Sequence, residues 1–260
     1  MTNYIEAGKL QYKPAEIAGV RIVIWKTKTA RKKEKNRPAE DMRVLGALGV
    51  VFQKNRKKGT EIKQTGVPEL ILPGQDLSDE DCVLSCPRPD PEEWSCARTE
   101  LGKPYFIHHP ELHFSLSDSG KITAVAFSEQ PAGLDIQLHQ RRGIRRTEAE
   151  DAERLSRLAR RFYHPEECDF VLSEEKGRRE RFYRVWTAKE AYVKYTGQGI
   201  DGMFAKISVK PEGKDFPEKM RGSARLLQPV VWQALGCTFC CCEPEEGLSL
   251  CLCRKQPYEA

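Results

Sequence analysis

The sequence predicts an α+β fold, in which helices pack against antiparallel sheets. Helical and strand-like segments alternate irregularly along the chain, without the regular strand–helix repeat of a parallel doubly wound sheet. Towards its end the chain carries a run of short strand-like segments, which favours antiparallel pairing. At 260 residues it is long enough for two domains of ordinary size. We expect one domain over residues 1–130 and a second over residues 131–260.

The first half is predicted to contain strands and one long helix. Three segments have the composition of strands: residues 20–25, 113–116 and 122–127. A helix is expected over about residues 39–55, because Leu45, Leu48 and Phe52 would lie on one face. Residues 128–132 include a proline and are the expected crossing between the halves.

The second half begins with a predicted strand over residues 133–138. In it Asp135 and Gln137 share one face, while Leu134, Ile136 and Leu138 share the other. A charged helix is expected over about residues 147–161, and a second helix is expected over the stretch that contains residues 186–194. We therefore expect a strand that presents two oxygen-bearing side chains, followed by two helices.

The helix over residues 186–194 also presents polar side chains together. Trp186, Glu190 and Lys194 are spaced four residues apart, so they fall on nearly one face of a helix. A carboxylate and an ammonium group on one face can point at the same ligand. Together with Asp135, this pattern favours a site for a divalent metal and a phosphate.

Cysteines are concentrated near the end of the chain. The sequence has ten, and six of them lie between residues 237 and 253. A zinc site is one interpretation. The irregular spacing instead favours two strands over residues 237–242 and 247–253, in which cysteine acts as a small hydrophobe. We expect reduced thiols and a cytoplasmic protein, because no apolar run has the length of a membrane span and the first residues do not resemble a signal peptide.

The basic residues are clustered, although the formal net charge is only +5. The clusters occupy residues 31–37, 54–58, 141–146 and 176–181. Such clusters can bind polyanions, or they can be solvated loops and helix faces. We expect no nucleic-acid partner, because aromatic residues do not alternate with the cations as stacking platforms require. A basic nucleic-acid-associated protein remains the more distant alternative.

Four motifs in order resemble those of the 4′-phosphopantetheinyl transferases of the surfactin-synthetase-activating (Sfp) type. The first two are Leu101-Gly102-Lys103-Pro104 and Phe114-Ser115-Leu116-Ser117-Asp118-Ser119-Gly120. The other two are Gly133-Leu134-Asp135 and Trp186-Thr187-Ala188-Lys189-Glu190-Ala191-Tyr192-Val193-Lys194. The resemblance covers roughly residues 100–205, and four ordered motifs are more specific than one.

The resemblance implies two similar α+β halves related by a pseudo-twofold axis, with the active site in the cleft between them. It implies transfer of the phosphopantetheine arm of coenzyme A to a serine of an acyl or peptidyl carrier protein, with release of 3′,5′-ADP. The partners would be coenzyme A and the apo carrier protein, and no membrane. One chain would hold both halves, so a monomer is expected.

The resemblance also assigns the catalytic residues. Asp135 and Glu190 match the Mg²⁺ ligands of the family, Glu190 or a water that it orients would act as the base, and Lys194 would contact the pyrophosphate. Gln137 stands where many members carry a third acidic ligand. Each residue also has an ordinary explanation: Thr187 and Glu190 fit a helix capping box, Glu190 and Lys194 fit a helical ion pair, and Asp135 fits a guard at the edge of a sheet.

The resemblance assigns coenzyme A contacts to the first half. Lys103 and Pro104 match positions that border the adenine, and Ser117 and Asp118 match positions at the nucleotide phosphates. Arg43 would grip the 3′-phosphate. Asp118 replaces a histidine of the family, and a carboxylate repels a phosphate. Together with Gln137, it leaves open a paralogue that binds coenzyme A or a carrier protein without catalysis.

Overall fold

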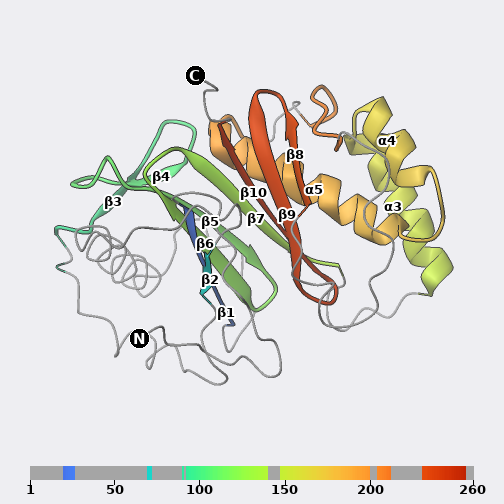
Figure 1. The fold of residues 1–260 in the computed structure, drawn as a ribbon, viewed down its shortest axis with the longest axis horizontal. Helices are drawn as coiled ribbons and strands as arrows, with labels where there is room; N and C mark the ends of the chain where they lie inside the picture. The colour runs from blue at the N-terminus through green and yellow to red at the C-terminus, as the bar shows by residue number, and fades with distance from the viewer. Residues whose placement is uncertain are drawn as a thin grey trace. The chain divides into compact units, whose positions relative to one another are not determined.

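A computed structural model of the chain describes residues 20–26, 69–71, 90, 92–139, 147–199, 204–211 and 230–255. The chain divides into two compact units, Met1–Ala132 and Gly133–Ala260 (Figure 1). The helix expected over residues 39–55, Arg43 and three of the four basic clusters lie outside the described residues. In the described part of the chain, no helix is both long enough and apolar enough to cross a membrane.

The first unit contains a four-stranded sheet in the order β2-β1-β6-β5. Its strands are β1 (Val20–Lys26), β2 (Glu69–Ile71), β5 (His113–Ser119) and β6 (Ile122–Ser128). β6 pairs antiparallel with both β1 and β5, so the three strands predicted here are confirmed. The pair of β1 and β2 is parallel, which makes the sheet mixed rather than antiparallel throughout.

A small hairpin completes the described part of this unit. It consists of β3 (Cys96–Arg98) and β4 (Pro104–Phe106), paired antiparallel. Phe106 packs with Trp94 and with apolar side chains of β5 and β6 in one buried cluster. The hairpin is therefore anchored to the sheet by its inward-facing phenylalanine.

The described part of the second unit contains a four-stranded sheet in the order β7-β10-β9-β8 and three helices. Its strands are β7 (Ala132–Leu138), β8 (Val230–Ala234), β9 (Cys237–Glu245) and β10 (Leu248–Lys255). Its helices are α3 (Glu148–Phe162), α4 (Pro165–Leu172) and α5 (Arg178–Thr196). Helix α5 packs along β10, as Figure 1 shows. The described residues therefore form an α+β fold, as predicted.

Local sequence explains where two of these helices begin and end. Thr147 caps α3: its Oγ1 accepts a hydrogen bond from Glu150 N, and the Glu150 carboxylate accepts one from Thr147 N. Helix α5 ends at Thr196 and is capped by Gly197, whose φ of +73° is a conformation that glycine adopts at no steric cost. The helices predicted around residues 147–161 and 186–194 are confirmed.

The cysteine-rich segment forms the strands β9 and β10, as predicted. Cys241 and Cys251 are opposite each other in the ladder, and both are buried in the core beneath the helices. Cys237 and Cys253 belong to the same buried cluster. Among the described residues, no three His, Cys, Asp or Glu side chains lie close enough together to hold a metal ion. The burial of Cys237, Cys241, Cys251 and Cys253 in one cluster shows that they pack as small side chains in the core.

Candidate functional site

The contact between β7 and α5 depends on Gly133. A Cβ atom built on this residue would lie 1.9 Å from Ala191 O and 2.4 Å from Tyr195 N. Both neighbours are backbone atoms of the helix, so no rotamer change can make room. The strand and the helix thus touch backbone to backbone, and any residue larger than glycine would separate them.

Asp135 lies on the face of β7 that Gly133 turns toward α5, because residues two apart in a strand share a face. Its side chain is buried, and Oδ1 accepts a hydrogen bond of 2.7 Å from Lys194 Nζ. Such a charge-assisted hydrogen bond is stronger than a neutral one. The predicted metal ligand and the predicted phosphate-binding lysine are therefore in direct contact.

The strand and the helix run in opposite directions. Gly133 faces residues 191 and 195, whereas the Tyr183 hydroxyl donates to the carbonyl oxygen of His139. Residues 133–139 span roughly 20 Å at about 3.3 Å per residue. Residues 183–193 span about 15 Å at 1.5 Å per residue. Asp135, a third of the way along the strand, is therefore level with residue 190 of the helix.

Glu190 occupies that level, one helical turn before Lys194. Its side chain is partly exposed, and residues four apart lie on the same face of a helix. The geometry thus puts the Glu190 position on the side of α5 from which Lys194 reaches Asp135. Its role as a base and metal ligand remains a prediction.

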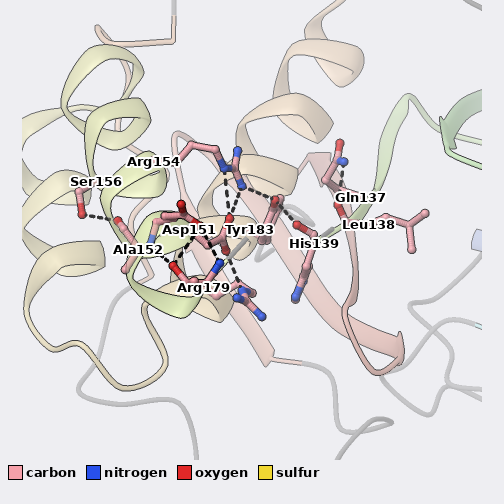
Figure 2. Close-up of polar contacts among 11 residues, drawn as sticks. Gln137, Leu138, His139, Asp151, Ala152, Arg154, Ser156, Arg179 and Tyr183 are labelled. Atoms are coloured by element: carbon pink, nitrogen blue, oxygen red, sulfur yellow. Dashed lines mark hydrogen bonds and ion pairs between the residues drawn. The ribbon is translucent and has the colours of Figure 1, made fainter. Parts of the chain in front are cut away.

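Gln137 is the next residue of β7 on the same face, and it is partly exposed. Its Nε2 donates a hydrogen bond of 3.0 Å to Leu138 O (Figure 2). Since the amide nitrogen is turned to the backbone, the side-chain oxygen is the atom suited to a cation. Two carboxylates and an amide oxygen are hard donors, which is the ligand type that Mg²⁺ prefers. The residues present therefore fit a magnesium ion by their chemistry.

The structure changes two of the ordinary explanations for these residues. The capping-box interpretation is wrong, because α5 begins at Arg178 and Thr187 is in its interior, where its Oγ1 donates to Tyr183 O at 2.9 Å. Asp135 is on β7 at the end of the described sheet, yet it is only 5% exposed. A side chain so buried cannot protect an exposed strand edge from pairing. For the third explanation, the helical ion pair, the structure shows that Lys194 forms an ion pair with Asp135 of β7.

A hydrogen-bond network fixes the end of β7, and sequence reasoning did not find it (Figure 2). The buried Asp151 of α3 accepts from Arg154 Nε and Nη2 and from Arg179 Nε, at 3.0 to 3.1 Å. Arg154 Nη2 also donates to the Tyr183 hydroxyl at 3.2 Å, and this hydroxyl donates to His139 O. Helices α3 and α5 thereby hold the residue that follows the Asp135 strand.

His139 is locked into the same network. Its ring stacks on Tyr183 at 4.4 Å, and its Nε2 lies 2.8 Å from Ser249 Oγ. Burial, and secondarily the charge of Arg179, lowers the pKa of His139 to about 4. The imidazole is therefore neutral at physiological pH and acts as a fixed packing and hydrogen-bonding group. The spacing of the histidines in the sequence gave no indication of this buried role of His139.

Among the described residues, the predicted coenzyme A contacts of the first unit lie on two hairpins. Lys103 precedes β4, which Pro104 begins, and Lys103 N donates to Thr99 Oγ1 at 3.1 Å. The Ser117 side chain is buried on β5, whereas Asp118 is exposed. Thr123 Oγ1 donates to Asp118 Oδ1 at 2.9 Å across the β5–β6 hairpin. The aspartate thus has a local hydrogen-bonding partner, and the coenzyme A contacts remain predictions.

The match of the chain to known proteins covers the β7–α5 site. Residues 131–235 match the model of the 4′-phosphopantetheinyl transferase superfamily. This part of the chain is therefore similar to that superfamily. The family predicted from the four motifs is thereby confirmed, and the matched region contains Asp135, Gln137, Glu190 and Lys194.

Curated relatives carry the same family name. The chain is 31% identical over 112 residues to 4′-phosphopantetheinyl transferase Sfp of Bacillus subtilis (strain 168), which is 43% of this chain and 45% of that protein. It is 34% identical over 101 residues to 4′-phosphopantetheinyl transferase psf-1 of Bacillus pumilus, 38% of each chain. It is 29% identical over 157 residues to 4′-phosphopantetheinyl transferase gsp of Aneurinibacillus migulanus, 55% of this chain and 56% of that one. The chain spans about half the length of the curated relatives that it matches.

Proposed function

We propose that this protein transfers the 4′-phosphopantetheine arm of coenzyme A to a serine of an acyl or peptidyl carrier protein. The ion pair between Asp135 and Lys194 carries the proposal, because it joins the two superfamily motifs at 2.7 Å in one place. A carboxylate for a metal and a cation for a phosphate are what transfer from a pyrophosphate requires.

The reaction joins the serine oxygen to the phosphorus on the pantetheine side of the pyrophosphate. The bond from this phosphorus to the bridging oxygen breaks, and 3′,5′-ADP leaves with the electron pair. Glu190, or a water that it orients, takes the serine proton. Lys194 lies on the same face of α5 as Glu190, so its ammonium group would stabilise the negative charge of the pyrophosphate.

Asp135, Glu190 and Gln137 would hold a Mg²⁺ ion. When bound, the ion neutralises charge on the pyrophosphate oxygens. Gln137 contributes a neutral oxygen where many members of the family have an acid, so the site carries one negative charge fewer. We therefore expect weaker Mg²⁺ binding than a site of three carboxylates would give.

Coenzyme A is proposed to contact the first half of the chain, residues 1–130. Lys103 and Pro104 would border its adenine, Ser117 and Asp118 its phosphates, and Arg43 its 3′-phosphate. The second half, residues 131–260, would supply metal ligands and base, in a pseudo-twofold arrangement with the active site in the cleft between the halves.

We propose that the protein acts as a cytoplasmic monomer. The basic segment of residues 141–146, which comes after β7 in the sequence, would steer the acidic surface of a carrier protein. No nucleic-acid or membrane partner is proposed.

One observation favours a second function. Asp118 is exposed and accepts a hydrogen bond from Thr123, at the position where the family has a histidine at the nucleotide phosphates. A carboxylate there would repel a phosphate unless a cation lies between them. A paralogue that binds coenzyme A or a carrier protein without catalysis is the alternative.

Intact-mass spectrometry separates the two functions. Apo carrier proteins from fatty-acid, polyketide and peptide synthesis would be incubated with the protein, coenzyme A and Mg²⁺. The variant Glu190→Ala tests the base, and Glu153→Ala on the exposed face of α3 is the matched control. We expect a gain of one phosphopantetheine mass with the wild type and Glu153→Ala, and none with Glu190→Ala. Coenzyme A binding in a calorimeter without any mass gain would support the paralogue instead.

A further inference from the structure

Lys189 directly precedes the proposed base, yet it points into the core. Its side chain and that of Glu167 are both fully buried. Lys189 Nζ donates to Glu167 Oε2 at 2.6 Å and to Ile207 O at 2.6 Å. The rings of Tyr163 and Phe204 lie 5.9 and 5.7 Å from the ammonium group. The ammonium group of this motif lysine is thus enclosed by protein and cannot touch a bound substrate.

The Glu167 carboxylate connects this lysine to three other parts of the unit. It is the third residue of α4, and its Oε2 accepts from His164 N at 2.9 Å. Its Oε1 accepts from Val209 N at 2.7 Å. Val209 O in turn accepts from Trp232 Nε1 of β8 at 3.0 Å. One buried ion pair therefore ties α5 to α4, to the segment of residues 204–211 and to β8.

A buried ion pair of this kind fixes the orientation of α5 more than it stabilises the fold. Apolar residues of similar volume can often replace such a pair without loss of stability, whereas removal of one partner leaves a costly buried charge. The hydrogen bonds of Lys189, unlike apolar contacts, hold one rotation of α5 about its axis. Glu190 follows Lys189 by about 100° around the helix, so its direction depends on that rotation.

We propose that Lys189 and Glu167 are positioning residues. Their ion pair would hold α5 in the rotation at which the Glu190 side chain faces Asp135 of β7. This inference rests on the proposed transferase function. Side-chain ends lie about 5–6 Å from a helix axis, so a rotation of about 20° moves a carboxylate by roughly 2 Å. A misplacement of about 1 Å can cost roughly 100-fold in rate. Loosening the pair should therefore lower catalysis in a protein that is still folded.

The test compares Lys189→Met, the double variant Lys189→Met with Glu167→Gln, and the control Lys210→Met, in which the lysine is exposed. Melting temperature, kcat, KM for coenzyme A and the Kd for Mn²⁺ alone, measured by electron paramagnetic resonance, are compared with the wild type. Of the three variants, Lys189→Met should have the lowest melting temperature, because it leaves the buried Glu167 carboxylate without its counter-charge. The double variant removes both charges and should recover most of the melting temperature.

In the folded double variant, we expect kcat to fall at least 10-fold, KM for coenzyme A to stay within about twofold and the Mn²⁺ Kd to rise about 10-fold. Lys210→Met should leave all of these unchanged. A folded double variant with the kcat and Mn²⁺ Kd of the wild type would overturn the positioning role. If the wild type binds Mn²⁺ but transfers nothing, the transferase proposal fails, and the Mn²⁺ Kd alone decides the positioning role. A wild type that neither transfers nor binds Mn²⁺ overturns both.

Discussion

Replacing Gly133 by alanine tests whether strand β7 and helix α5 must touch. The added methyl carbon would start 1.9 Å from Ala191 O, about 1.5 Å short of the 3.4 Å at which ordinary contact begins. The obstructing atoms belong to the helix backbone, so the two elements must move apart. Overpacking a core costs about 1–3 kcal/mol, and we expect the upper end, about 3 kcal/mol. For a unit of this size that lowers the melting temperature by roughly 10 °C.

Thermal unfolding followed by circular dichroism measures this effect. Gly199→Ala is the matched control: it also adds one methyl group, but nothing lies within 4 Å of the added atom. Its φ of +77° costs only about 1–2 kcal/mol when the residue is not glycine. Gly133→Ala should therefore be clearly the less stable of the two. Equal melting temperatures for the two variants would show that the backbone contact is not as tight as inferred.

Three further changes have defined outcomes. Tyr183→Phe removes the hydroxyl that accepts from Arg154 and donates to His139 O, and should lower the free energy of unfolding by about 1–3 kcal/mol in urea titrations; an unchanged midpoint would contradict the network. Leu235 has a φ of +53° in the turn between β8 and β9, so Leu235→Asn should raise the melting temperature by a few degrees, equivalent to about 1 kcal/mol. Burial raises the pKa of Cys96 to about 11, so its alkylation, followed by peptide mass spectrometry, should become roughly tenfold faster for each pH unit between 8 and 10; a rate independent of pH would refute this.

Strongly patterned elements of the fold could be predicted from the sequence. β5, β6 and β7 alternate or carry apolar runs, and α3 carries a capping box at Thr147. The hairpin of β3 and β4 was not predicted, because three residues are too few to show a period. The parallel pairing of β1 with β2 was also missed, since it joins segments more than forty residues apart.

The candidate site was partly readable for a similar reason. Asp135 and Gln137 share a face by strand periodicity, and Glu190 and Lys194 share one by helix periodicity, so local spacing could find them. The contact of Lys194 with Asp135 depends on how α5 lies on β7, which no local pattern specifies. Thr187 was mistaken for a possible cap, because its spacing from Glu190 is that of a capping box. The helix in fact begins nine residues earlier, at Arg178.

The buried charged residues that support the site were harder to predict from the sequence than the site residues themselves. Lys189 and Glu167 are 22 residues apart, and each alone resembles a surface charge in a helix. Asp151 and Arg179 are 28 residues apart and lie on different helices. Burial of a charged residue becomes visible only when the packing of α3, α4 and α5 is known, because charged residues are rarely buried unless they are paired.

A double-mutant cycle on Asp135→Asn and Glu190→Gln tests the central claim that β7 and α5 build one catalytic site. The transfer rate to an apo carrier protein would be measured for the wild type, both single variants and the double variant, with circular dichroism to confirm folding. Residues that act as a unit are strongly non-additive. We predict that the double variant loses about as much rate as the worse single variant. Losses that multiply independently would show that Asp135 and Glu190 act at separate places, and would contradict the account.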